Sequence, residues 1–249
     1  VQIDLGSARY DKARSIQACA ALTDHLASLP EVKALGTSPN LFYGGGGWLS
    51  IREYLPEAQE DGPKGSRARY GAKVVAGRDF FAAMGIPLLK GRLFKSRDSA
   101  PNSEKVAIID ESLARRLRPD GNALDCLVQW GVPELGDMIP DVFRVVGIVA
   151  SVPGVQEREA RPQMYTPAGA DELSPYFYMH VGDRGAVETL RLRIAEETRR
   201  IDPRIPILSV KTLAEIRNSN PDVWTARFLT RLALAAAGGA LFLAALGIY

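Results

Sequence analysis

The chain has 249 residues, of which 46% are hydrophobic and 24% are charged. This balance is typical of a folded globular protein and excludes both disorder and collagen-like order. The 31 basic and 29 acidic residues leave a formal net charge of +2, so charge gives no reason to expect a nucleic-acid partner.

The N-terminal region reads as a strand, a helix and a second strand. An alternating pattern begins at Val1 and predicts the first strand. Residues 11–29 predict a helix, because apolar side chains recur there at spacings of three and four, and Pro30 ends it. Val32–Thr37 is the second predicted strand. Such a unit has apolar faces that must pack against another part of the chain.

A distinct middle section follows a connection rich in glycine and polar residues, between residues 44 and 69. Its predicted strands are 72–76, 106–110, 127–130 and 142–152, and its predicted helices are 78–84 and 111–117. The predicted core residues of its first part are Phe80, Phe81, Met84, Ile86, Leu88 and Leu89, with Gly85 and Gly91 as turn residues.

A second strand–helix–strand unit lies towards the C-terminal end. Pro175–Gly182 alternates as a strand, residues 186–201 carry the apolar stripe of a helix, and Ile205–Val210 is again extended. Because the two units share this order, we predict an α+β fold. Both chain ends would form a split βαβ sandwich, and the middle section would be an inserted mixed α/β lobe.

Charge is absent after Arg231, where the sequence becomes LALAAAGGALFLAALGIY. This apolar run approaches the roughly 20 residues that cross a hydrocarbon core of about 30 Å, so it predicts the start of a transmembrane helix. The predicted membrane-spanning residues are Leu232, Leu234, Leu241, Phe242, Leu243, Leu246, Ile248 and Tyr249. A buried core helix is the alternative, although such helices usually keep a polar edge. Since the run ends with the chain, we expect a fragment of a longer polypeptide.

Motifs that would indicate catalysis or nucleotide binding are missing. The glycine run at 44–47 continues as Trp48-Leu49-Ser50, without the Lys-Ser/Thr that a P-loop needs, and no GxGxxG or GxSxG occurs. The carboxylate pair Asp110-Glu111 is interpreted as a helix cap, and Glu196-Glu197 as a solvated helix face. The sequence therefore predicts no catalytic residues and no cofactor.

Cysteines and histidines are few. Cys19 and Cys126 are compatible with one disulfide and equally with two isolated small hydrophobic residues. His25 and His180 have no neighbours at the spacing of metal ligands, so no metal site is predicted.

Four sequence blocks resemble the extracytoplasmic domain of MacB-like and FtsX-like ABC transporter permeases. They are VVAGRDFFAAMGIPLLKGRLF (74–94), VAIIDESLARRLRP (106–119), FRVVGIVASV (143–152) and RPQMYTP (161–167). The final segment, 228–249, is similar to the second transmembrane helix of that family. The resemblance implies a porter-like subdomain from residues 1–60 and 153–217, an inserted second lobe from 61–152, and a coupling segment with the start of a transmembrane helix from 218–249.

The resemblance also implies a role and partners. We expect a noncatalytic domain that couples ATP-driven motion of membrane helices to export, including efflux, or to transmembrane mechanical signalling. Its partners would be a separate ABC-type ATPase, a second permease copy in a homodimer, the lipid bilayer and, for some members, a periplasmic adaptor. The expected location is the inner membrane, with this domain on the periplasmic side. Arg217, Arg227 and Arg231 would favour the cytoplasmic side by the positive-inside rule, but long translocated domains escape that rule.

An alternative from another class is a membrane-tethered binding module that recruits an envelope enzyme or adaptor without moving a substrate. The sequence leaves the substrate open.

Overall fold

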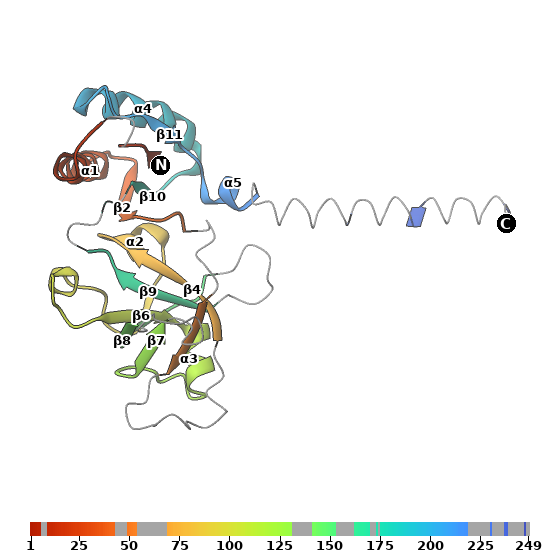
Figure 1. Ribbon diagram of the computed structural model, residues 1–249. Helices are drawn as coiled ribbons and strands as arrows, with labels where there is room; N and C mark the ends of the chain where they lie inside the picture. Colours follow the sequence, from red (N-terminus) through yellow and green to blue (C-terminus); the bar gives the residue numbers. More distant parts are fainter. Residues whose placement is uncertain are drawn as a thin grey trace.

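The computed structural model describes residues 1–5, 9–42, 49–53, 69–130, 141–152, 162–169, 173, 175–218, 230, 237–238 and 247. Two sheets divide these residues into two lobes, drawn one above the other in Figure 1. The N-terminal strand and the last strand both lie in the upper lobe, and the middle of the chain forms the lower one.

The first lobe is built from both ends of the described chain. Its elements are β1 (Gln2–Ile3), α1 (Lys12–Ala27), β2 (Val32–Ser38), β10 (Tyr176–Val181), α4 (Val187–Ile201) and β11 (Ile207–Ser209). The strands are antiparallel neighbours in the order β11-β1-β10-β2. This is the split βαβ arrangement, so the predicted sandwich is confirmed.

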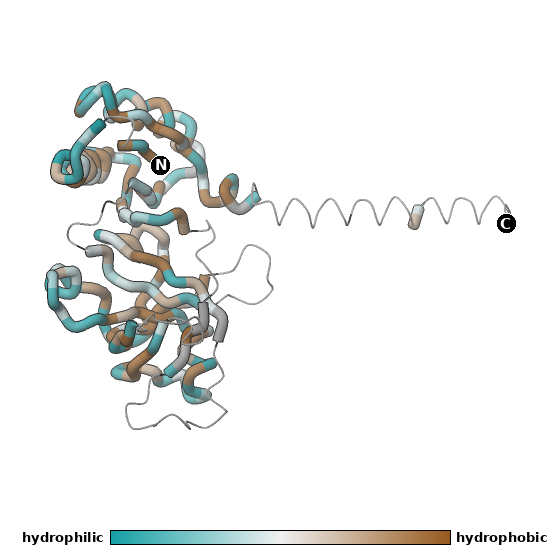
Figure 2. Tube along the Cα trace, viewed as in Figure 1, coloured by the Kyte–Doolittle hydropathy of each residue, from teal (hydrophilic) through white to brown (hydrophobic). Residues whose placement is uncertain are grey.

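Both helices of the first lobe form where the apolar stripes predicted them. The Asp11 side chain begins α1 by accepting a hydrogen bond from the Arg14 N–H at 2.7 Å. Leu22 of α1 and Ile194 of α4 are buried in one core with strand residues such as Phe177. In Figure 2, hydrophilic and hydrophobic stretches alternate along α4, as expected for a helix with one buried face.

The second lobe contains a closed sheet. Its strands are β3 (Leu49–Glu53), β4 (Arg69–Ala76), β5 (Leu88–Gly91), β6 (Val106–Asp110), β7 (Leu127–Trp130), β8 (Asp141–Val149) and β9 (Gln163–Pro167). Their order is β5-β8-β6-β9-β4-β3-β7, and β7 also pairs with β8. Six strands therefore close into a small mixed barrel, while β5 extends one end of β8.

Short helices complete the fold. They are α2 (Phe80–Met84), α3 (Glu111–Leu117), α5 (Leu213–Asn218) and the 3₁₀ turns η1 (Ser96–Ser99) and η2 (Arg184–Ala186). Leu113 and Ala114 of α3 pack into the barrel core, so α3 closes one end of the barrel. Asp110 caps α3 by accepting the Leu113 N–H at 2.8 Å, which confirms the predicted cap.

Several predictions need correction. Strands β3 and β9 lie outside the predicted limits of the inserted lobe, 61 and 152, yet both pair within its sheet. The helix predicted from residue 78 begins at Phe80, because Asp79 adopts a left-handed conformation with φ of 49°. Leu88 and Leu89 are not core residues: they are 38% and 46% exposed, since β5 pairs with β8 at the rim of the sheet.

No helix among the residues that the structure describes is long and apolar enough to cross a membrane. The membrane-spanning residues predicted between Leu232 and Tyr249 lie outside the described residues. The glycine run at 44–47 also falls outside them.

Candidate functional site

Helix α2 lies between the two lobes and touches both. A Cβ atom on Gly36 of β2 would lie 2.6 Å from the Phe80 Cα atom, so the two backbones are in direct contact. Next to it, the Thr37 N–H donates to the Arg78 carbonyl at 3.0 Å, and the Gly77 N–H donates to the Thr37 carbonyl at 2.9 Å. Backbone hydrogen bonds therefore fix the segment before α2 to the first lobe.

An aromatic cluster around Phe80 forms a core that the lobes share. The fully buried Phe80 ring lies 5.4 Å from the Tyr178 ring of β10 and 6.2 Å from the Tyr165 ring of β9, between ring centroids. Phe81 packs edge-on against Tyr165 at 5.0 Å. We call this cluster, with the apolar residues around it, the interlobe core; it contains Val74, Ala76, Phe80, Phe81, Ala83, Ile86, Ile108, Val149, Tyr165 and Tyr178. Because residues of both sheets meet in it, the two lobes pack as one body.

Polar groups at the edge of the interlobe core form hydrogen bonds with other groups of the protein. The Tyr178 hydroxyl accepts the Phe42 N–H at 2.8 Å and donates to the Asn40 carbonyl at 3.1 Å. Burial raises the pKa of Tyr178 above its usual range. The Ser38 hydroxyl donates to the Val75 carbonyl at 2.7 Å, which links β2 of the first lobe to β4 of the second.

Helix α5 is attached to α4 by a bidentate ion pair. Arg191 Nη2 of α4 lies 2.7 Å from each carboxylate oxygen of Glu215. Glu215 also accepts the Thr212 N–H at 2.7 Å, while its own N–H donates to the Thr212 hydroxyl at 3.1 Å. The Arg191 hydrogen bonds, followed by the Thr212 N–H, lower the pKa of Glu215 to about 2. Leu213 packs against the interlobe core, so α5 contacts both α4 and the junction of the lobes.

We call residues Arg191, Thr212, Leu213 and Glu215 the α5 clamp. None of these residues was predicted from the sequence as part of a site. Thr212 and Glu215 have the spacing of a capping box, which is a signal that was present in the sequence. Arg191, by contrast, lies on α4, and β11 separates α4 from α5 in the chain. No local sequence pattern therefore indicates that Arg191 pairs with Glu215.

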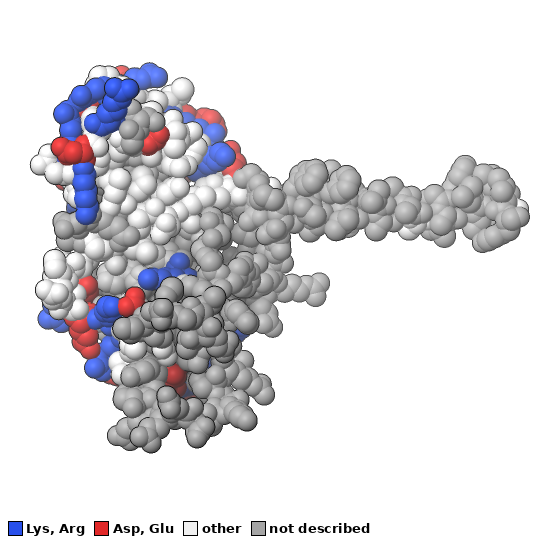
Figure 3. Space-filling view, in the orientation of Figure 1, with Lys and Arg blue, Asp and Glu red and all other residues white. Residues whose placement is uncertain are grey.

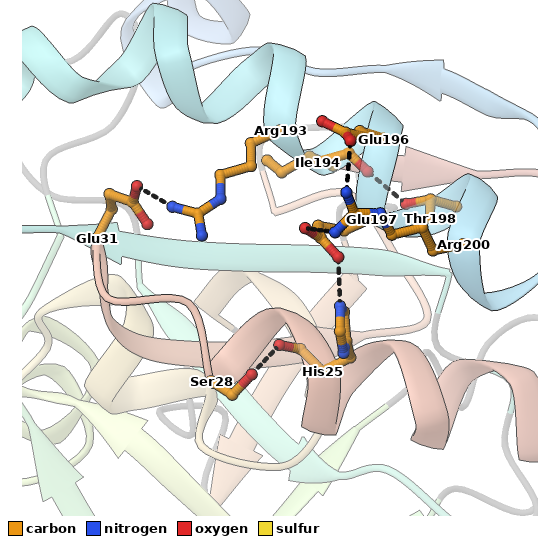
Figure 4. A network of polar contacts seen from close by, with 9 residues as sticks. All are labelled: His25, Ser28, Glu31, Arg193, Ile194, Glu196, Glu197, Thr198 and Arg200. Atoms are coloured by element: carbon orange, nitrogen blue, oxygen red, sulfur yellow. Dashed lines mark hydrogen bonds and ion pairs between the residues drawn. The ribbon is translucent and has the colours of Figure 1, made fainter.

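A polar network joins α1 to α4 across the outer side of the first lobe (Figure 4). His25 Nε2 and Glu197 Oε2 lie 2.7 Å apart, and Arg200 Nη1 donates to the other Glu197 oxygen at 3.0 Å. Glu197 is 7% exposed, so its interpretation as part of a solvated helix face was wrong, because this side of α4 faces α1. The His25 hydrogen bond lowers the pKa of Glu197. Glu196 is exposed and pairs with Arg200, as predicted for the surface.

Asp110 connects three parts of the barrel. One carboxylate oxygen accepts the Leu113 and Gln163 N–H groups, at 2.8 and 3.1 Å, and the other accepts the Ser151 hydroxyl at 2.9 Å. Burial raises the pKa of Asp110 to about 6, although these hydrogen bonds oppose the shift. The contacts are those of a structural cap, as the sequence indicated.

The two cysteines do not meet. Cys19 is buried in the core of the first lobe and Cys126 in the barrel core, and neither is part of a disulfide. The disulfide alternative is therefore excluded in this structure. Among the described residues, no group of three or more His, Cys, Asp or Glu side chains could hold a metal ion.

Two clefts border the interlobe region. One, of about 540 Å³, lies between α1 and the second lobe and is lined by residues such as Ile16, Arg78 and Phe94. The other, of about 260 Å³, lies beside the α5 clamp and is lined by Met84, Leu190 and further residues of α4, β10 and α5. In the view of Figure 3, charged side chains gather on the outer parts of both lobes, and the described surface between them is mostly uncharged.

Solved structures with similarity to this chain include two extracytoplasmic domains of transporters and a domain of a permease. The periplasmic region of MacB from Actinobacillus actinomycetemcomitans is 15% identical, with a TM-score of 0.47 and 73% of each chain covered. The extracellular domain of the noncanonic ABC-type transporter YknZ from Gram-positive bacteria is 14% identical, with a TM-score of 0.42, covering 73% of this chain and 80% of that one. A domain of a protein named as a permease, from Porphyromonas gingivalis, is 16% identical, with a TM-score of 0.45 and coverage of 80% and 84%. None of the curated proteins matches the chain.

The sequence also matches a known family over most of its length. Residues 22–200 match the MacB-like periplasmic core domain, so the chain belongs to that family. Members of the family are noncatalytic periplasmic domains of ABC transporter permeases, and the resemblance noted in the four sequence blocks is confirmed.

Proposed function

We propose that this domain moves as one rigid body with the chain that follows α5, and so couples ATP-driven motion of membrane helices to export or to transmembrane mechanical signalling. The observation that carries the proposal is the shared interlobe core together with the α5 clamp. ATP hydrolysis would take place on a separate ABC-type ATPase. The working unit would be a permease homodimer in the inner membrane, with this domain on the periplasmic side and, as for some members of the family, a periplasmic adaptor bound to it.

The physical basis of the proposed coupling is that a rigid body converts a small rotation at one end into a larger displacement at the other. Helix α5 ends at Asn218, the residue at which the predicted coupling segment begins. A rotation of that segment reaches α4 through the Arg191–Glu215 pair and reaches the second lobe through Leu213. Packed cores transmit such movements because they deform little. A small rotation near the membrane would therefore displace the far end of the second lobe by a larger distance.

The proposal can be tested in the full permease reconstituted with its ATPase in lipid nanodiscs. A spin label at position 17, an exposed site on α1, reports the distance between the two copies with and without vanadate-trapped nucleotide. We expect a nucleotide-dependent change in the parent protein, in which Cys19 and Cys126 are replaced by alanine. In the double variant T212A/E215Q the change should shrink, because α5 is no longer fixed to α4.

The matched control is E188Q. Glu188 also lies beside Arg191, but its Oε1 atom is 3.6 Å from the Arg191 Nε atom and its side chain is 81% exposed. E188Q should behave like the parent protein in distance change and in ATP hydrolysis. Absence of any nucleotide-dependent change in the parent protein, with ATP hydrolysis intact, would contradict the coupling role.

A specific surface feature supports the alternative role as a binding module. Leu88, Leu89 and Leu93 are between 38% and 46% exposed; the first two belong to β5 and the third follows it in the chain. An exposed edge strand with apolar side chains is typical of a surface that binds another chain. Under this alternative, L88S/L89S should release an envelope partner that co-purifies with the full permease. L192S, which changes a leucine that is 78% exposed on α4, should retain it.

A further inference from the structure

The barrel of the second lobe is open at the end opposite α3. There the inward-facing side chains are those of Lys73 and Val75 on β4, Thr166 on β9 and Phe143 on β8. They line a pocket of about 450 Å³, and the segment that contains η1 and residues 100–105 forms its outer wall. Pockets at the mouths of small barrels are common ligand sites, and this volume lies in the usual range for a small molecule.

Most charged groups around this pocket are already paired. The pairs are Asp98 with Arg92 at 2.5 and 3.0 Å, Glu104 with Arg144 at 2.5 Å, and Asp141 with Lys105. The two charges within each pair neutralise each other, so the three pairs add no net charge to the pocket.

Lys73 differs from these residues. Its ammonium group lies 5.6 Å from the centroid of the Phe143 ring, and no described carboxylate is within ion-pair distance of it. Its register partner on β9 is Met164, which is fully buried in the barrel core, so the Lys73 side chain leaves the sheet on the inward face. The pocket therefore contains one positive charge that the described residues do not compensate.

We propose that the barrel mouth binds a small molecule that carries a carboxylate or phosphate group, with Lys73 as its counter-ion. A lysine provides a compact charge on a flexible stem, which suits either anion. Hydroxyl groups of Ser99 and Thr166 line the same pocket and are able to donate hydrogen bonds to the anion. Neither of these hydroxyls nor Lys73 belongs to the α5 clamp or the interlobe core, so this site goes beyond the proposed coupling role.

The pocket also has a route of access. Ser99, Pro167 and Gly169 line both this pocket and the cleft between the lobes. A ligand can therefore enter the pocket from the cleft between α1 and the second lobe, and on the way it would contact Pro167 and Gly169.

The test is a titration of the ¹⁵N-labelled full chain in detergent with inorganic phosphate and, separately, with acetate, at constant ionic strength. The readouts are the backbone amide shifts of Asn102, Val106 and Thr166, which border the pocket. We expect saturable shifts with at least one of the anions. The anion whose titration curve saturates identifies the chemical group, phosphate or carboxylate, that the site prefers.

Two variants of Lys73 and one control make the result specific. K73Q should weaken binding at least tenfold, and K73M, which keeps the apolar stem over Phe143, should do the same. K90Q changes an exposed lysine on β5 and should bind like the parent chain. Saturable binding that survives in both Lys73 variants would overturn the proposal, and so would shifts that saturate with neither anion in the parent chain.

Discussion

Replacing Phe80 by alanine tests how the lobes are joined. Phe80 is fully buried, and its ring has four aromatic neighbours, Phe42, Phe81, Tyr165 and Tyr178, with centroids between 5.4 and 6.2 Å away. F80A removes the ring that contacts tyrosines of both sheets. Buried Phe-to-Ala changes cost about 3–5 kcal/mol in total, and aromatic pairs contribute about 0.5–1.5 kcal/mol beyond area burial. Because Phe80 has four aromatic neighbours, we expect a cost in the upper part of that range, about 4–5 kcal/mol.

Calorimetry of the full chain in detergent measures this effect. At about 2–4 °C per kcal/mol for a domain of this size, Tm should fall by about 8–20 °C. Because the interlobe core loses its central ring, the lobes should also melt in two transitions. The control L22A removes a fully buried leucine from the first lobe alone, at a cost of about 2–5 kcal/mol, and should leave one transition. A loss below about 1 kcal/mol for F80A would refute the packing described for the interlobe core.

Three further predictions concern single sites. G36A should destabilise the domain by about 1–3 kcal/mol in urea unfolding, because its Cβ would lie 2.6 Å from the Phe80 Cα atom; an unchanged midpoint would contradict the close contact. The folded-state pKa of Asp110 is about 6, above the unfolded value of about 3.9, so the folded state binds the proton more tightly. Stability should therefore rise by about 1.4 kcal/mol as the pH falls from 7.5 to 5, and D110N should lose this part of the pH dependence. Cys19 and Cys126 should react with a thiol reagent only after unfolding, and both should react then without a reductant; fewer than two reactive thiols would contradict the absence of a disulfide.

The sequence was most informative where local signals were strong. The helix at 111–117 and the strand at 127–130 have the predicted bounds, since each carries a clear periodic pattern, and Asp110 marks the start of that helix. The order of the two strand–helix–strand units was enough to predict the split sandwich. The predicted turn residues Gly85 and Gly91 both have positive φ, at 64° and 76°, which glycine adopts without strain.

Long-range pairing was not predictable in the same way. Strand β9 joins the barrel by pairing in parallel with β4, far away in the sequence, and β3 joins it by pairing with β4 and β7, so no local pattern shows that either strand belongs to this sheet. For the same reason the sequence identified Phe80 and Phe81 as core residues but not as the core between two lobes. Leu88 and Leu89 look like core residues by composition, and only their position at the rim of the sheet exposes them.

The partners of the charged residues depended on tertiary structure as well. Glu197 and Glu196 are neighbours on one helix, yet α1 covers Glu197 and leaves Glu196 in solvent. The Lys73 side chain could not be placed inside the barrel until the register of β4 with β9 was known.

The most direct test of the central claim measures the distance between the lobes during the transport cycle. Spin labels at positions 17 and 122, exposed sites on α1 and on the loop after α3, are placed in one copy of the full permease, with the second copy unlabelled. The account predicts a single distance that is the same in the nucleotide-free and vanadate-trapped states. A shift of the mean distance between those states would contradict the rigid coupling of the two lobes.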